Sequence, residues 1–457
     1  MRTQTDEGYT HALGNRQVQM IAIGGAIGVG LFLGSGGRLA AAGPALVLSY
    51  AAAGVAAFFV MRALGELVLY RPTSGSFVDY AAEFIGPWAA FASGWMYWIN
   101  WAFTGIAELT AIAAYIHYWA PAFPESLTAL IALGFVLAVN LLSVRLFGEL
   151  EFWFAMLKVL AISVFLVLGL VLVVFTVGAA GPQNLTAHGG FLPMGFPLVL
   201  MSLQSVVFAY SSIELVGITA GETARPHEIM PKAINGVVWR IAIFYVGSVA
   251  LLAMVLPWTA YRAGTSPFVT VFSGLGIPWA ADAMNLVVIT AAMSSCNSGL
   301  YATGRILRSM AMKEEAPRFA GALSSRHVPI GGILFTASMF LAGVALFYFL
   351  PERAFNIATA AASLGVITTW GVLVYCQTRL RRTGHRSEFP MPGSPYTNWL
   401  TLAFLALVVL LMPFADRDQR VAFFLIPALV AAIALGWRIV RRRRTSRCPS
   451  PDRSGAG

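Results

Sequence analysis

Long windows of the chain contain no Asp, Glu, Lys or Arg, and many of them are about as long as, or longer than, the roughly 20 residues that cross a hydrocarbon core. They include residues 39–61, 126–144, 241–261, 283–304, 327–351, 354–378 and 389–415. Their apolar residues run continuously instead of alternating with polar ones, which is not typical of barrel strands. Since a helix satisfies its own backbone hydrogen bonds in lipid, the windows predict an all-α polytopic membrane protein.

The composition excludes several other classes of protein. Of the 457 residues, 58% are hydrophobic and only 11% are charged, against roughly 25% charged in a soluble domain. The three cysteines are too few and too scattered for a disulfide framework, and the six histidines form no HExxH pair. We therefore expect no metal, no cofactor and no enzymatic activity, because an enzyme needs a convergent set of catalytic groups.

Breaking the hydrophobic blocks at Pro, Gly and charged clusters gives twelve candidate membrane spans. They are about 17–38, 42–64, 88–118, 126–144, 152–177, 198–220, 237–258, 280–305, 329–350, 354–378, 397–414 and 421–439. An even number of spans places both termini on one side of the membrane. We expect a tail at 1–16, a twelve-helix membrane domain at 17–440 and a basic tail at 441–457.

Lys and Arg residues are distributed unevenly between the two sides. The side with the termini and the even-to-odd connections collects all but five of the 30 Lys and Arg residues. The other side keeps Arg38, Arg262, Arg353, Arg417 and Arg420. By the positive-inside rule we expect both termini to be cytoplasmic in a protein that crosses its membrane many times. The net charge of +10 follows from this topology and requires no nucleic-acid partner.

Among the charged residues inside the expected spans, where a charge costs at least a few kcal/mol, three stand out. Glu108 lies near the middle of the third span, and Glu214 follows two serines in the middle of the sixth. Lys158 lies about one turn inside the fifth span, where its long side chain could also reach the interface. Because buried carboxyl and amino groups can exchange protons near neutral pH, these residues suit proton coupling.

Two spans are expected to be broken. The first places six glycines among the sixteen residues of IAIGGAIGVGLFLGSG, at 21–36, and the sixth contains the polar stretch FAYSSIELVG, at 208–217. Transporters with inverted repeats place paired discontinuous helices around a binding site at the midplane. We therefore expect repeats at 17–177 and 198–378, with extra helices at 397–439.

A broken membrane helix is suited to an amino acid ligand. Its freed N–H groups and the positive end of the resumed helix favour a carboxylate, and its freed carbonyl groups favour an ammonium. Glycine lets a ligand approach the main chain closely. Taken alone, the glycines at 24–30 could instead allow two helices to pack closely against each other. The second expected break, in the sixth span, favours a binding site over close packing.

Several long stretches resemble the bacterial amino acid permeases of the amino acid, polyamine and organocation superfamily. They are IGGAIGVGLFLGSG, FAYSSIELVGITAGETARPHEIMPKAINGVVWRIAIFYVGS, GELEFWFAMLKVLAI and MSSCNSGLYATGRILRSMA. The resemblance runs from about residue 15 to about residue 440. It implies the leucine-transporter fold of ten core helices plus two, and proton-coupled uptake of an amino acid.

The resemblance also implies a substrate site. The family's carboxylate-binding backbone matches Gly28, Val29 and Gly30, and its amine-binding carbonyl groups match Ala26, Ala209 and Ser211. Phe208 matches the aromatic residue that covers the bound substrate, which we interpret as a gate.

The same resemblance assigns proton coupling. Lys158 matches the amine that proton-coupled relatives use in place of a sodium ion, near Ser294 and Ser295. Glu108 matches an acidic position linked with substrate or proton recognition, and Glu214 matches an acidic position in the break of the sixth span.

The side chain of the substrate is read from other stretches. The C-terminal third, including FPMPGSPYTNWLTLAFLALVVLLMPF, resembles permeases for L-asparagine, whose amide needs a donor and an acceptor that Thr104, Glu108 and Asn297 could supply. IAELTA in the third span resembles aromatic and 4-aminobutyrate permeases equally well. The sequence therefore leaves open whether the substrate is another amino acid, including D-serine, D-alanine or glycine. It also leaves open whether the protein is an exchanger of the same fold, and what its oligomeric state is.

Overall fold

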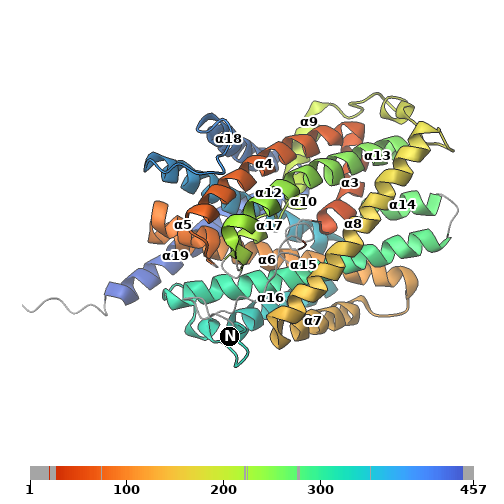
Figure 1. Ribbon diagram of the computed structural model, residues 1–457. Helices are drawn as coiled ribbons and strands as arrows, with labels where there is room; N and C mark the ends of the chain where they lie inside the picture. The colour runs from red at the N-terminus through yellow and green to blue at the C-terminus, as the bar shows by residue number, and fades with distance from the viewer. Residues whose placement is uncertain are drawn as a thin grey trace, which may run out of the picture.

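The part of the chain that the structure describes is built from helices (Figure 1). The computed structural model describes residues 20, 27–73, 75–220, 223, 225–274, 278–349 and 351–445. The α-helices are α2 Val29–Phe32, α3 Gly34–Ala42, α4 Leu46–Tyr70, α5 Ser76–Phe84, α6 Pro87–Trp119, α7 Glu125–Leu142, α8 Val144–Val174, α9 Phe196–Met201, α10 Leu203–Ala209, α11 Leu215–Thr219, α12 Pro226–Ile241, α13 Ser248–Val255, α14 Pro267–Gly274, α15 Pro278–Met312, α16 Ile330–Phe349, α17 Pro351–Arg382, α18 Tyr396–Leu411 and α19 Arg417–Thr445. Every long element in these ranges is helical, as the charge-free windows predict.

Eight helical stretches in the described residues are long and apolar enough to cross a membrane. They are Gly34–Tyr70, Pro87–Trp119, Glu125–Leu142, Val144–Val174, Trp279–Met312, Phe355–Arg382, Tyr396–Phe414 and Arg417–Arg443. Shorter apolar helices at Phe196–Ala209, Ala242–Val255 and Ile330–Ala345 lie in the expected sixth, seventh and ninth spans. The first expected span, 17–38, lies partly outside the described residues. The all-helical fold with many membrane-length helices is thereby confirmed.

The start of α8 differs from the expected start of the fifth span. The charged stretch GELE, at 148–151, led us to expect the helix from 152, but α8 begins at Val144 with a hydrogen bond from the Leu146 N–H to the Ser143 side chain (3.0 Å). Lys158 therefore lies about four turns inside the helix instead of one, and its side chain is fully buried. The interpretation that Lys158 reaches the interface is wrong.

Helices α6, α15 and α17 form the centre of the bundle, because both α15 and α17 pack along α6. At Gly365 of α17 a Cβ atom would lie 2.5 Å from the carbonyl oxygen of Met96, so only glycine lets these two backbones approach. By contrast, the apolar window of α19 is not buried at all, and α19 runs out at one edge of the bundle (Figure 1). The central helices therefore position the polar residues considered below.

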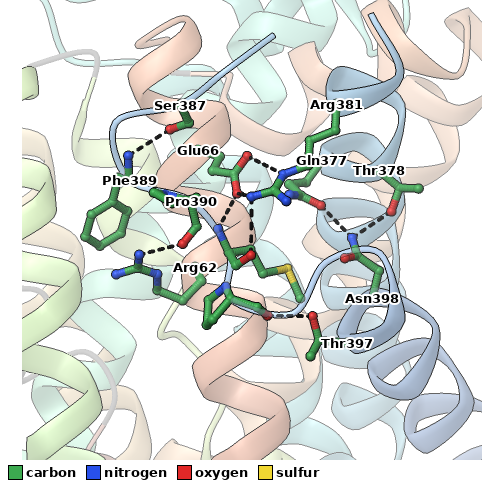
Figure 2. Close-up of polar contacts among 12 residues, drawn as sticks. Arg62, Glu66, Gln377, Thr378, Arg381, Ser387, Phe389, Pro390, Thr397 and Asn398 are labelled. Atoms are coloured by element: carbon green, nitrogen blue, oxygen red, sulfur yellow. Dashed lines mark hydrogen bonds and ion pairs between the residues drawn. The ribbon is translucent and has the colours of Figure 1, made fainter. Parts of the chain in front are cut away.

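A buried carboxylate on α4 ties together segments that are distant in sequence (Figure 2). Glu66 accepts hydrogen bonds from Arg381 Nη2 (2.6 Å) and Nε (3.1 Å), from Gln377 Nε2 (3.0 Å) and from the backbone N–H of Met391. Asn398 of α18 donates to Gln377 Oε1 at 2.5 Å. The carboxylate thus joins the ends of α4 and α17, the segment after α17 and the start of α18.

We expect Glu66→Ala to lower the free energy of unfolding by about 3–5 kcal/mol, because the Arg381 guanidinium loses its partner in a largely buried site. Thermal or denaturant unfolding of the purified protein in detergent measures the change. Glu388→Ala is the matched control, since Glu388 is exposed in the same segment and should change stability by no more than about 0.5 kcal/mol. Equal effects of the two substitutions would contradict a stabilising role for the cluster.

Candidate functional site

A cavity of about 640 Å³ opens at one end of the bundle, and we call it the vestibule. Gly30 and Phe208, which lie at the two expected breaks, line its deep part, while Arg38, Glu125 and Asp416 lie at helix ends around its mouth. Another groove, of about 770 Å³, lies between α6 and α19, away from the breaks and next to the exposed face of α19. The vestibule is the cavity that reaches the predicted site.

The vestibule is surrounded by connections from odd-numbered to even-numbered spans, which the expected topology places on the same side of the membrane. Arg38, Glu125, Ala263, Phe355 and Asp416 belong to five different odd-to-even connections or their flanking helix ends, and all line this cavity. The opposite end of the bundle, which we call the basic end, carries the start of α8 and the ends of α4, α15 and α17. This arrangement agrees with the spacing of the expected spans.

An ion pair lies at the mouth of the vestibule. Arg38 Nη1 donates to Asp416 Oδ2 at 3.0 Å. Partial burial opposes ionisation of Asp416, but the backbone N–H of Gln419 and the Arg38 guanidinium outweigh it and hold the pKa of Asp416 below its usual range. Asp416 therefore stays ionised near neutral pH, and it does not act as a proton-binding group there.

The expected break in the sixth span is confirmed. Helix α10 ends at Ala209 and α11 begins at Leu215, and between them Ser212 adopts a positive φ of 74°. In the first span, α2 is a single turn that follows Gly28, and Ala26 lies outside the described residues. A Cβ atom at Gly30 would lie 2.6 Å from the Cα atom of Ala209, so the two interrupted regions contact each other through their backbones.

Glu108 of α6 lies against the start of α2. Its carboxylate interacts with the Ser295 side chain and with the backbone N–H of Val29, and a Cβ atom at Gly28 would lie 3.1 Å from its Oε1 and 3.8 Å from Ser295 Oγ. Its Oε2 atom is buried and has no hydrogen-bond partner among the residues that the structure describes. Four predicted site residues, Gly28, Val29, Glu108 and Ser295, thus meet at one point.

Lys158 and Ser294 also meet, together with a carboxylate that the sequence analysis missed. Lys158 Nζ donates to Ser294 Oγ at 2.8 Å, and Ser294 Oγ donates to Glu151 Oε1 at 2.5 Å. Glu151 and Lys158 are seven residues apart on α8, which places them on one face about two turns apart. The seven-residue spacing of the two opposite charges is the sequence signal for this pair. The expected fifth span begins at 152 and so leaves Glu151 outside it.

Asn297 faces Glu151 and α7. Its Nδ2 donates to Glu151 Oε2 at 3.4 Å, and its Oδ1 accepts from Asn140 Nδ2 at 2.8 Å. Thr104 donates to Asn100 within α6 at 3.3 Å and lies one turn before Glu108. Both Asn297 and Thr104 are buried, and their contacts with a substrate stay a prediction.

The remaining predicted residues lie in or beside the break of the sixth span. Phe208 lines the vestibule, and Ser211 lies just after α10 with its N–H donating to the Phe208 carbonyl oxygen at 2.9 Å. Glu214 is fully buried where α11 begins, and its Oε2 accepts from Trp370 Nε1 at 3.3 Å. Among the described residues, no three His, Cys, Asp or Glu side chains come together as a metal-ligand set.

The chain is similar to known proteins over nearly its whole length. A family model described as amino acid permease matches residues 17–450. L-asparagine permease of Streptomyces coelicolor is 53% identical over 449 residues, covering 96% of this chain and 92% of the relative. L-asparagine permease of Escherichia coli is 52% identical over 453 residues, with 96% and 90% covered, and L-asparagine permease 1 of Mycobacterium tuberculosis is 52% identical over 456 residues, with 96% and 92% covered.

We expect Gly30→Ala to reduce transport by about tenfold or more, because the added methyl group collides with the Ala209 backbone and such overpacking costs about 1–3 kcal/mol. Uptake of labelled substrate, normalised to the amount of protein in the membrane, measures the loss. Gly34→Ala is the control, since its Cβ atom would lie 3.8 Å from the nearest atom. Wild-type uptake by Gly30→Ala would show that the contact between the interrupted regions is dispensable.

Proposed function

Because the chain belongs to the amino acid permease family, we propose that it takes up L-asparagine together with a proton across the cytoplasmic membrane by alternating access. Membership of the family makes the protein an amino acid transporter and not an enzyme. Asparagine as the substrate is supported by the names of relatives that are 52–53% identical over nearly the whole chain.

One observation carries the proposed binding site: Gly30 and Phe208 of the two interrupted regions both line the vestibule, and these regions contact each other at Gly30 and Ala209. The backbone N–H groups of Gly28, Val29 and Gly30 bind the substrate carboxylate, and the carbonyl groups of Ala26, Ala209 and Ser211 accept from its ammonium group. Phe208 covers the bound substrate from the vestibule side. The interaction between the Glu108 carboxylate and the Val29 N–H supports this placement, since it places a carboxylate near that N–H.

The substrate side chain lies toward α6 and α15. An amide needs a donor and an acceptor, and Thr104, Glu108 and Asn297 provide them from these helices. Glu108 Oε2 supports the assignment, because it is a buried acceptor without a partner among the described residues, and such a group is costly unless a ligand satisfies it.

Proton coupling depends on Lys158 with Ser294 and Ser295, and on Glu108 and Glu214. Support comes from the burial of all three charged groups and from the Lys158–Ser294 hydrogen bond of 2.8 Å. A buried amine that gains and loses a proton changes its interaction with Ser294 and with the carboxyl groups of Glu151 and Glu108, which links the proton to the conformational change.

The proposed architecture is a five-plus-five inverted repeat of the leucine-transporter type, with repeats at 17–177 and 198–378 and two extra helices at 397–439. The tails at 1–16 and 441–457 are both cytoplasmic, so the vestibule opens to the outside. The peripheral position of α19 supports its assignment outside the repeat.

Purified protein in proteoliposomes is expected to accumulate labelled L-asparagine when only an inward proton gradient is imposed, because the proton supplies the driving force. Proteoliposomes without the gradient are the control. A requirement for amino acid loaded inside would instead identify an exchanger. Inhibition by excess glycine, D-serine, 4-aminobutyrate or aromatic amino acids, with no inhibition by unlabelled asparagine, would overturn the substrate assignment.

Lys158→Ala is expected to lose gradient-driven accumulation by at least about tenfold while it retains asparagine exchange, because the substrate site itself does not include the amine. Accumulation and exchange are measured in the same proteoliposome preparation. Unchanged accumulation would remove Lys158 from the coupling mechanism.

A further inference from the structure

We propose that Glu151 is a second proton-carrying group, which receives the proton of Lys158 through the Ser294 hydroxyl on its way to the basic end of the bundle. This inference rests on the proposed proton-coupled function and deepens it. Proton coupling then uses a relay of two groups on one helix instead of a single buried amine.

The geometry of the three side chains forms a continuous hydrogen-bonded line. Lys158 Nζ lies 2.8 Å from Ser294 Oγ, and Ser294 Oγ lies 2.5 Å from Glu151 Oε1. All three side chains are fully buried, so no bulk solvent enters the line. The Ser294 hydroxyl accepts from the amine and donates to the carboxylate, which is the arrangement that a proton relay through a hydroxyl requires.

The transfer balances without any other reactant than the transported proton. One N–H bond of the Lys158 ammonium breaks as an O–H bond forms at Ser294 Oγ, while the original Ser294 O–H bond breaks and its proton forms an O–H bond at Glu151 Oε1. The products are a neutral amine, an unchanged serine and a protonated carboxyl group. Release of that proton to water restores the carboxylate, and a proton from the vestibule side restores the ammonium.

The charged groups around this line are few. Lys158 is the charged group that acts on Glu151, and Lys158 in turn is influenced by Glu151 and by Glu108 of α6. The neighbouring helices α15 and α7 contribute neutral polar groups, namely Ser298, Asn297 and Asn140. One amine therefore interacts with two carboxyl groups, and in the proposal its proton passes toward Glu151.

The two carboxyl groups lie on opposite sides of Lys158 along the proposed path. Glu108 is at the substrate site, next to Gly28. The backbone of Glu151 lies roughly 10 Å from that of Lys158 along α8, toward Val144 and the basic end, and the side chains of the two residues meet at Ser294. The Asn140–Asn297 hydrogen bond of 2.8 Å orients the amide that contacts Glu151. Glu151 is thus held in place as the acceptor on the exit side.

A pair of stacked rings separates Glu151 from the basic end. Phe147, one turn before Glu151, stacks on Tyr301 with ring centroids 4.0 Å apart, and the Arg305 guanidinium lies 3.4 Å from the centroid of the Tyr301 ring. Both rings are buried. Release of the proton from Glu151 then requires these rings to separate, which would tie release to opening at the basic end.

The decisive variant is Glu151→Gln, which preserves an acceptor for Ser294 but cannot bind a proton. We expect exchange of labelled asparagine within about twofold of wild type, gradient-driven accumulation reduced at least about tenfold, and a flattened pH profile of uptake. Labelled asparagine should still enter the vesicles down its own gradient, and a pH-sensitive dye inside them should then report no proton entry. Glu149→Gln, the same change two residues away at a partly exposed position, should leave accumulation and proton entry at wild-type values.

Ser294→Ala is the second variant, because it removes the hydroxyl bridge and leaves both ionisable groups in place. Ser294→Ala should also lose gradient-driven accumulation and retain asparagine exchange. It therefore tests the relay even if Glu151→Gln fails to fold. Wild-type accumulation with an unchanged pH profile in either folded variant would overturn the relay, as would loss of exchange together with accumulation in both. Failure of the wild-type protein to couple uptake to the proton gradient would instead overturn the proposed function.

Discussion

A backbone N–H or C=O group without a hydrogen-bond partner is too costly to leave in hydrocarbon, and the rest of this structure depends on that constraint. It explains why the long elements of the described residues are helices. It also restricts where a helix can be interrupted. The break at 210–214 is buried throughout, so protein atoms, and not lipid, surround the freed backbone. The same requirement makes such a place suitable for a polar ligand.

Buried charges obey the same rule at the level of side chains. Glu66 accepts a hydrogen bond from Arg381, Glu151 accepts one from Ser294, and Glu214 accepts one from Trp370, in each case from another helix. Each of these bonds fixes how two helices face each other, since a shift along the axis would leave a carboxylate without its partner. The groups that we propose to bind protons and the groups that stabilise the bundle are therefore both buried polar side chains. In the proposal they differ in whether a mobile proton or the substrate can reach them.

Much of the fold and part of the candidate site could be predicted from the sequence. The break in the sixth span was visible as AYSSIE between apolar residues, and Glu108 and Lys158 were visible as charges inside expected spans. Glu151 was missed because it stands beside Glu149, in a stretch typical of a helix end. Glu66 was missed for a similar reason, since Arg62 precedes it by one turn. Charge clusters of this kind end a helix only when the surroundings are water.

The amino-acid sequence by itself determined which segments can lie in lipid and where their backbone is interrupted, because hydropathy and glycine content act locally along the chain. Only the tertiary structure decided which buried groups meet. Glu151 and Ser294 are 143 positions apart, Glu66 and Arg381 are 315 apart, and nothing local to either residue specifies the other. Helix packing sets these pairs, because a hydrogen bond depends on distances of a few ångström that only the assembled bundle defines.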